Sequence, residues 1–144
     1  MKKPGFTLVE ILFAISIIAM TAIIGIPFYQ NAIKNLNLSS VARSMASDLR
    51  YAQQLAVTTQ ISHSVIFSII NNSYQLKNQE TQAIIKTVKI DDGISLDSIT
   101  GLEYDTATFN ATGAATSTGI ITLKNANNRT STIEIKPSGY VKIQ

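Results

Sequence analysis

The chain is 144 residues long, is 45% hydrophobic, contains no cysteine and carries a formal net charge of +3. This length leaves room for one domain and an anchor, and the missing cysteine excludes disulfide bridges, thiolate zinc sites and cysteine nucleophiles. Lys2 and Lys3 supply two of the positive charges, so the remainder is close to neutral and argues weakly for nucleic-acid binding.

The first expected element is an apolar helix near the N-terminus. Residues 6–26 are 21 in number and carry a single charge, that of Glu10. As a helix they would span roughly 32 Å, about the thickness of one hydrocarbon core. Lys2 and Lys3 precede the run and the next charge is Lys34, so the positive-inside rule places the N-terminus in the cytoplasm and the C-terminal part outside.

Glu10 distinguishes this run from two common apolar segments. A cleavable secretory signal has an apolar region of about 7–15 residues that ends in a small-residue cleavage site, and residues 6–26 are too long for that. A plain single-pass anchor leaves Glu10 unexplained, because an unpaired carboxylate in lipid costs about 2–3 kcal/mol or more. The simpler alternative to a specific partner is a carboxylate near the headgroups that reaches water.

The segment from Gly5 to Glu10 reads GFTLVE and resembles the processing motif of type IV prepilins and of the pseudopilins of type II secretion. The resemblance implies that prepilin peptidase removes residues 1–5 by cutting after Gly5, and that the new N-terminal residue, Phe6, is methylated. Pro4 departs from the motif, which commonly has a basic residue at this position. Glu10 follows the new amine by four residues, so its carboxylate is expected to meet the amine of a neighbouring subunit and set the register of a filament.

The helix is expected to continue to about Gln60 with a change of surroundings. Residues 6–27 form the membrane or filament-core part, and Pro27 is expected to kink the helix. Residues 28–60 are amphipathic, with apolar residues at steps of three to five that should pack on a sheet. This stripe comprises Ile33, Leu36, Val41, Met45, Leu49, Ala52 and Leu55.

Residues 61–144 change to an apolar period of two, which predicts a strand-rich head. Turn residues separate the expected strands. Strands are expected near 65–69, 74–77, 84–90, 120–123, 132–136 and 140–143, with weaker ones at 94–96, at 102–104 and within 106–119. A head of this size needs the helix stripe for much of its core. The expected fold class is therefore α+β, a long N-terminal helix packed on a small β-rich head.

The helix end at 49–56 and the order of the last strands are similar to the GspH/FimT group of minor pseudopilins. This resemblance implies a head of two antiparallel sheets and a structural, non-enzymatic role at the pseudopilus tip of type II secretion. A minor type IV pilin acting in pilus assembly, adhesion or DNA uptake is the alternative. The implied partners are prepilin peptidase, other pseudopilins or pilins, and the bacterial inner membrane, which the chain would cross once before assembly.

No residue pattern points to catalysis, to a cofactor or to a metal site. The single histidine, His63, is expected at the surface or at a strand edge, and the acidic residues of 91–105 fit solvated turns better than an EF-hand. Some minor pilins of the resembling group bind DNA through a basic C-terminal region. Arg129, Lys136 and Lys142 are the matching candidates here, although solvated strand faces are the simpler interpretation.

Overall fold

The computed structural model describes residues 5–144. Residues up to Ile33 form one compact unit, and Lys34–Gln144 form the other. A single helix, α1 (Leu8–Thr59), belongs to both units. The helix passes Pro27 without a break, so no unwinding occurs there, and the kink expected at this residue stays a prediction.

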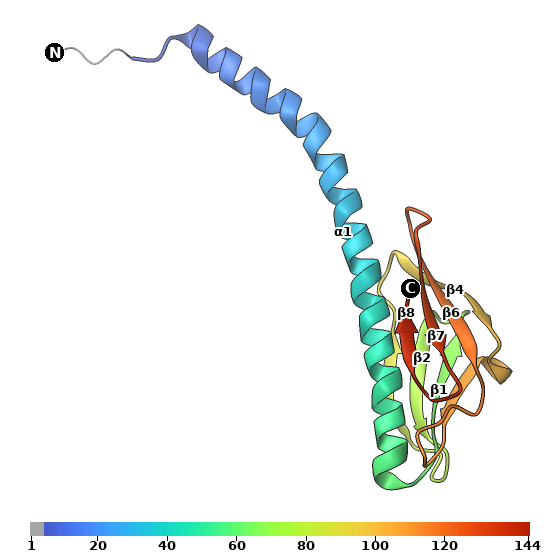
Figure 1. Cartoon of the computed structure of the whole chain (residues 1–144). Coiled ribbons are helices and arrows are strands. Elements are labelled where there is room, and N and C mark those ends of the chain that lie inside the picture. Colours follow the sequence, from blue (N-terminus) through green and yellow to red (C-terminus); the bar gives the residue numbers. More distant parts are fainter. Residues whose placement is uncertain (1–4) are drawn as a thin grey trace. The chain divides into compact units, whose positions relative to one another are not determined.

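In the head unit, α1 buries a face that is rich in alanine. Figure 1 shows this part of the helix lying along the two sheets. The expected stripe is wrong at its start, because Ile33 and Leu36 are 37% and 68% exposed. Apolar spacing alone does not show which of two adjacent helix faces the strands cover. The face that they do cover carries several alanines, and these small side chains let the helix backbone pack close to the strands. The buried residues are Leu38, Ala42, Met45, Ala46, Leu49, Ala52 and Ala56.

Two antiparallel sheets of four strands form the rest of the head, which confirms the expected α+β class. The first sheet has the order β3-β2-β1-β5, and the second has the order β4-β6-β7-β8. The strands of the first sheet are β1 (His63–Ser68), β2 (Ser73–Asn78), β3 (Ile84–Lys89) and β5 (Thr106–Phe109). Those of the second are β4 (Ile94–Thr100), β6 (Gly119–Asn125), β7 (Thr130–Ile135) and β8 (Val141–Ile143).

The chain between β4 and β5 differs from the expectation of a weak strand at 102–104. It forms a short 3-10 turn, η1 (Glu103–Asp105). Tyr104 and Asp105 have φ values of 51° and 52°, and two successive residues in the left-handed region cannot continue a strand. Leu102 packs against the core, whereas the Tyr104 side chain is 88% exposed.

Asp48 joins α1 to the first sheet. Its carboxylate accepts a hydrogen bond of 2.7 Å from the hydroxyl of Tyr74 and pairs with Lys86 Nζ at 2.7 Å. Burial, together with the hydrogen bond to Asp48 and its charge, raises the pKa of the Tyr74 phenol. The phenol therefore stays protonated across the neutral pH range, and its hydrogen bond to Asp48 links α1 to β2.

Two side chains of α1 donate hydrogen bonds to the loop after β5 and to β8. Gln53 Nε2 donates a hydrogen bond of 2.8 Å to the carbonyl of Gly113, and Arg50 Nη2 donates one of 2.9 Å to the carbonyl of Val141. Gly139, with a φ of +79°, packs directly against Gly113 and Gln53. The helix, the loop after β5 and the turn before β8 thus meet at one point.

Candidate functional site

The N-terminus of α1 is built around Thr7 and Glu10. The Thr7 carbonyl accepts a hydrogen bond of 3.3 Å from the amide of Ile11, and Thr7 Oγ1 accepts one of 3.3 Å from the amide of Glu10. In return, Glu10 Oε2 accepts hydrogen bonds of 2.8 Å from both the amide and the hydroxyl of Thr7. This reciprocal arrangement is a capping box, which the Thr-x-x-Glu spacing signals. Glu10 therefore has a local partner, Thr7, in addition to the neighbouring subunit expected from the sequence.

The second carboxylate oxygen of Glu10 is free to bind another donor. Oε1 accepts no hydrogen bond from residues 5–144, and the residue is exposed. An ionised carboxylate offers about four acceptor positions, so the contact with Thr7 and a contact with another chain do not exclude each other. The positive end of the helix dipole also favours a negative charge at this position.

Gly5 and Phe6 lie before the first helical residue and outside regular secondary structure. No atom stands within 4 Å of the place a Cβ would occupy on Gly5, and the Phe6 side chain is 85% exposed. Exposed bonds outside hydrogen-bonded structure are the preferred sites of proteolysis. The peptide bond between these residues is therefore accessible. Residues 1–4, including Pro4, lie outside the described residues.

The first part of α1 presents an apolar surface beyond Glu10. The helix is long and apolar enough to cross a membrane, and residues 6–30 are all exposed. Two hydroxyl groups in this part bond to the helix itself, because Ser16 donates to the Leu12 carbonyl at 2.7 Å and Thr21 donates to the Ile18 carbonyl at 2.9 Å. Such internal bonds satisfy polar groups where no water is present.

The structure separates Arg129 from the other two basic candidates. Arg129 precedes β7 and Lys136 follows it, so the length of the strand, about 20 Å, lies between them. Lys142 lies on β8, and Arg50 reaches the same strand through its bond to the Val141 carbonyl. Sequence reasoning does not find Arg50, because 91 positions separate it from Val141.

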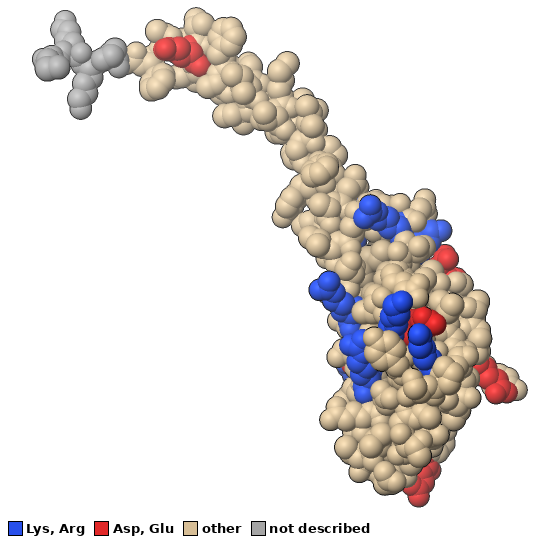
Figure 2. Space-filling model, in the orientation of Figure 1, with Lys and Arg blue, Asp and Glu red and all other residues tan. Residues whose placement is uncertain are grey.

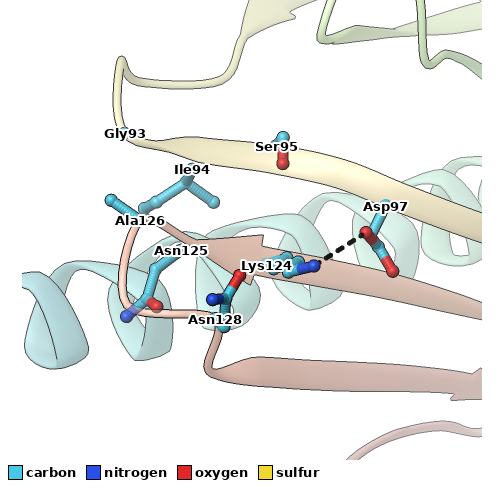
Figure 3. A pocket seen from close by; sticks show the side chains of 8 residues that line it. All are labelled: Gly93, Ile94, Ser95, Asp97, Lys124, Asn125, Ala126 and Asn128. Atoms are coloured by element: carbon cyan, nitrogen blue, oxygen red, sulfur yellow. Dashed lines mark ion pairs between the residues drawn. The ribbon is translucent and has the colours of Figure 1, made fainter.

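An open pocket of about 420 Å³ lies where β4 and β6 meet the turn after β6 (Figure 3). Ser95, Asp97, Lys124 and Asn128 are among its lining residues. Lys124 Nζ stands 3.8 Å from Asp97 Oδ1, and both side chains are more than a third exposed, at 37% and 42%. An ion pair this long and this exposed holds its partners loosely, and the pocket offers no nucleophile with an adjacent base.

The acidic side chains and the histidine are the remaining groups that could bind a metal ion. Within residues 5–144, no three His, Asp or Glu side chains come close enough to hold a metal ion. His63 is 2% exposed, which corrects the expected position at the surface or at a strand edge. It lies on β1, an inner strand between β2 and β5, and its Nδ1 bonds the Ile61 carbonyl at 2.8 Å.

Comparison with known proteins adds a motif and a fold. Residues 1–26 match the prokaryotic N-terminal methylation motif. One structure of the minor pseudopilin EpsH from the type II secretion system of Vibrio cholerae has a TM-score of 0.64 and 9% identity, covering 77% of this chain and 94% of that chain. The type IV minor pilin FimU of Pseudomonas aeruginosa has a TM-score of 0.63 and 13% identity, covering 77% of this chain and 90% of that chain. No curated protein matches the sequence.

A second EpsH structure agrees with these matches, at a TM-score of 0.63 and 11% identity over 75% of this chain and 96% of that chain. At such identities, the comparison establishes a shared fold. The chain thus combines the methylation motif with the fold of minor pseudopilins and minor type IV pilins. A secretion protein and a pilus protein match equally well, so the fold is common to both systems.

Proposed function

We propose that this chain, which joins an N-terminal methylation motif to a pilin-like fold, is a structural subunit of a type IV pilin-like filament. It is made as a precursor, held in the bacterial inner membrane by residues 6–27, and cut by prepilin peptidase between Gly5 and Phe6. The supporting observation is the succession of an accessible Gly5–Phe6 bond, a capping box at Glu10 and a helix apolar enough to cross a membrane.

Assembly is the mechanism of such a subunit. Cleavage creates a positive amine at Phe6, and Glu10 Oε1 is the oxygen available to receive it from an adjacent subunit. An amine or a carboxylate left alone in an apolar helix bundle is costly. The pair of the Phe6 amine and Glu10 therefore favours the one subunit register in which both charges are neutralised. The head remains outside the cytoplasm.

Within this class, we favour a minor pseudopilin of type II secretion that joins the pseudopilus tip. Support comes from the fold shared with EpsH and from the resemblance of the helix end at 49–56 to the GspH/FimT group. The partners would be other pseudopilins, bound through α1 and through the head.

Mass spectrometry of the membrane-bound chain tests the processing step. In cells with active prepilin peptidase, the chain should begin at Phe6 and carry one added methyl group. A Gly5→Val chain should keep its leader, because a branched side chain fills the position that the motif reserves for glycine. Gly25→Ala is the matched control, since no atom lies within 4 Å of its Cβ position either. A wild-type chain that kept its leader in these cells would refute the proposal.

A minor type IV pilin acting in DNA uptake is the second candidate. The fold shared with FimU is compatible with a pilus role. The structure also places Arg50 beside β8, the strand that carries Lys142, and Lys136 precedes the turn that leads to this strand. Three cations near one strand edge form a better phosphate-binding surface than the dispersed residues of the sequence.

Binding of the detergent-solubilised full chain to short duplex DNA tests this candidate. If the surface near β8 binds phosphates, a Lys136→Ala/Lys142→Ala chain should bind more weakly, with a salt slope reduced by about 2. Arg129→Ala is the control, because this residue lies at the other end of β7 and should leave binding nearly unchanged. Absence of binding by the wild-type chain at low salt would eliminate the DNA role.

A further inference from the structure

The turn between β1 and β2 presents two isoleucines to solvent. Ile70 is 97% exposed, more than any other large hydrophobic residue within residues 5–144, and Ile69 beside it is 43% exposed. Turns normally carry glycine, proline, asparagine, aspartate or serine. A side chain as exposed as that of Ile70 contributes almost nothing to the packing of the head. Two adjacent isoleucines at this position therefore indicate a contact with a surface outside the head.

Hydrogen bonds hold this turn in one conformation. The amide of Asn72 donates a hydrogen bond of 3.2 Å to the carbonyl of Ile69, which closes a β-turn with Ile70 at its second position. The side chain of Asn72 is fixed on β4, because its Nδ2 donates to the Ile94 carbonyl at 2.7 Å and its Oδ1 accepts from the Leu96 amide at 2.9 Å. A partner of Ile70 therefore meets a turn that is already ordered, which lowers the entropy lost on binding.

The β1–β2 turn lies at the end of the head that contains Lys34, the first residue of the head unit. Asn125 Nδ2 donates a hydrogen bond of 3.3 Å to the Lys34 carbonyl, and the next amide in the chain donates one of 3.1 Å to the Gly93 carbonyl. Figure 3 shows Gly93 and Ile94 beside this turn after β6, and Ile94 is bonded to the β1–β2 turn. We call this end of the head the proximal end; it comprises Lys34 and residues 69–72, 89–94 and 125–129.

We infer that the proximal end docks on the lipid surface around the membrane segment, with Ile70 inserted among the headgroups, before the subunit enters a filament. The inference rests on the proposed function and adds where the head lies in the membrane-bound state. Residues 6–27 end seven positions before Lys34 in one unbroken helix, a rise of about 10 Å. The headgroup layer is about 6 Å deep on each side of a bilayer, so a modest tilt of the helix lets Ile70 enter it.

Apolar insertion, rather than charge, holds this contact. The exposed charges of the proximal end nearly balance, because Lys34, Lys89 and Arg129 are opposed by Asp91 and Asp92. Figure 2 shows both kinds of charge close together at the upper end of the head. Docking should therefore depend little on anionic lipid. One isoleucine is sufficient because the anchor keeps the turn beside the bilayer at a high effective concentration. Such a contact is also weak enough to release when the subunit leaves the membrane.

Fluorescence quenching by labelled lipids tests the docking. The chain contains no cysteine, so one introduced cysteine carries a fluorescent label at a single known position. Asn71→Cys places the label beside Ile70, and Thr59→Cys places it at the last residue of α1. The processed full chain is reconstituted in vesicles of phosphatidylethanolamine and phosphatidylglycerol that contain a lipid with a nitroxide near its headgroup. The nitroxide should quench the label at position 71 and leave the label at position 59 bright.

Substitutions of exposed isoleucines separate insertion from mere proximity. Ile70→Ser should lower the quenching at position 71 at least about fivefold, and the head should still fold because Ile70 is almost fully exposed. Ile84→Ser is the matched control and should leave the quenching unchanged. Ile84 is 56% exposed and begins β3, whose other end pairs Lys89 with Ser73, so it lies away from the proximal end.

Three results would overturn the docking: no quenching at position 71 in the wild-type sequence, equal quenching with Ile70→Ser, or loss of quenching when phosphatidylcholine replaces phosphatidylglycerol. A turn that binds another protein instead of lipid would give the first result. The third would show that charge, rather than Ile70, holds the head.

The same preparations report the proposed function independently. A label at Ser16→Cys, within residues 6–27, should be quenched by a nitroxide placed deep in the acyl chains, and mass spectrometry should find a methylated Phe6. If both hold and position 71 is not quenched, the head docking is wrong and the membrane-anchored filament subunit stands. If Ser16→Cys is not quenched, or if the leader is intact, the proposed function itself fails.

Discussion

A Glu10→Val subunit is expected to be inserted and cleaved normally but to be depleted from filaments at least about tenfold, because the amine of Phe6 loses its partner in an apolar bundle. An unpaired charge there costs about 2–3 kcal/mol. The measurement compares the filament fraction sheared from cells with the membrane fraction, for wild type and variant expressed at equal levels. Normal assembly of Glu10→Val would refute the pairing role.

The capping box requires two control variants, because Glu10 also bonds Thr7. Thr7→Ala removes the hydroxyl that caps the Glu10 amide and should cost about 1 kcal/mol of local helix stability, with assembly retained. Glu10→Gln keeps an oxygen that can cap Thr7 but has no charge, and it should fail to assemble as Glu10→Val does. If Thr7→Ala failed while Glu10→Gln assembled, capping rather than charge would be the function of Glu10.

A Gly139→Ala head is expected to lose about 3 kcal/mol or more of unfolding free energy, from left-handed strain and overpacking together. Gly139 has a φ of +79°, and an added Cβ would collide with the carbonyl of Gly113 and with Gln53 Nε2. Those two groups are bonded to each other and tie α1 to the loop after β5. The loss of unfolding free energy is measured by urea unfolding of the full chain in mild detergent, with the circular dichroism of the tyrosines as the signal.

Gly93→Ala separates backbone strain from collision. Gly93 has a φ of +92°, but no atom lies within 4 Å of its Cβ position, so alanine there should cost only the left-handed strain, about 1–2 kcal/mol. Equal losses in the two variants would show that the collision of the added Cβ with Gly113 and Gln53 costs nothing beyond the left-handed strain.

The N-terminal candidate site could be located in the sequence because all its parts are contiguous, and its roles in processing and assembly stay predictions. Gly5, Phe6 and Glu10 lie within six residues, and a local motif with an apolar run determines a helix start whatever the rest of the chain does. The strand positions were also predictable for the most part, since a period of two is a local property. The weak strand expected at 102–104 was wrong, because left-handed backbone at Tyr104 is not visible in an apolar pattern.

The tertiary structure decided which faces meet. The apolar spacing of 28–60 allows more than one buried stripe, and strand placement selected the one that starts at Leu38. The order of the first sheet buried His63 between two neighbouring strands. The bond from Arg50 to β8 joins positions that are 91 residues apart along the chain. Burial and charge clustering depend on such non-local contacts, which periodicity within one segment does not encode.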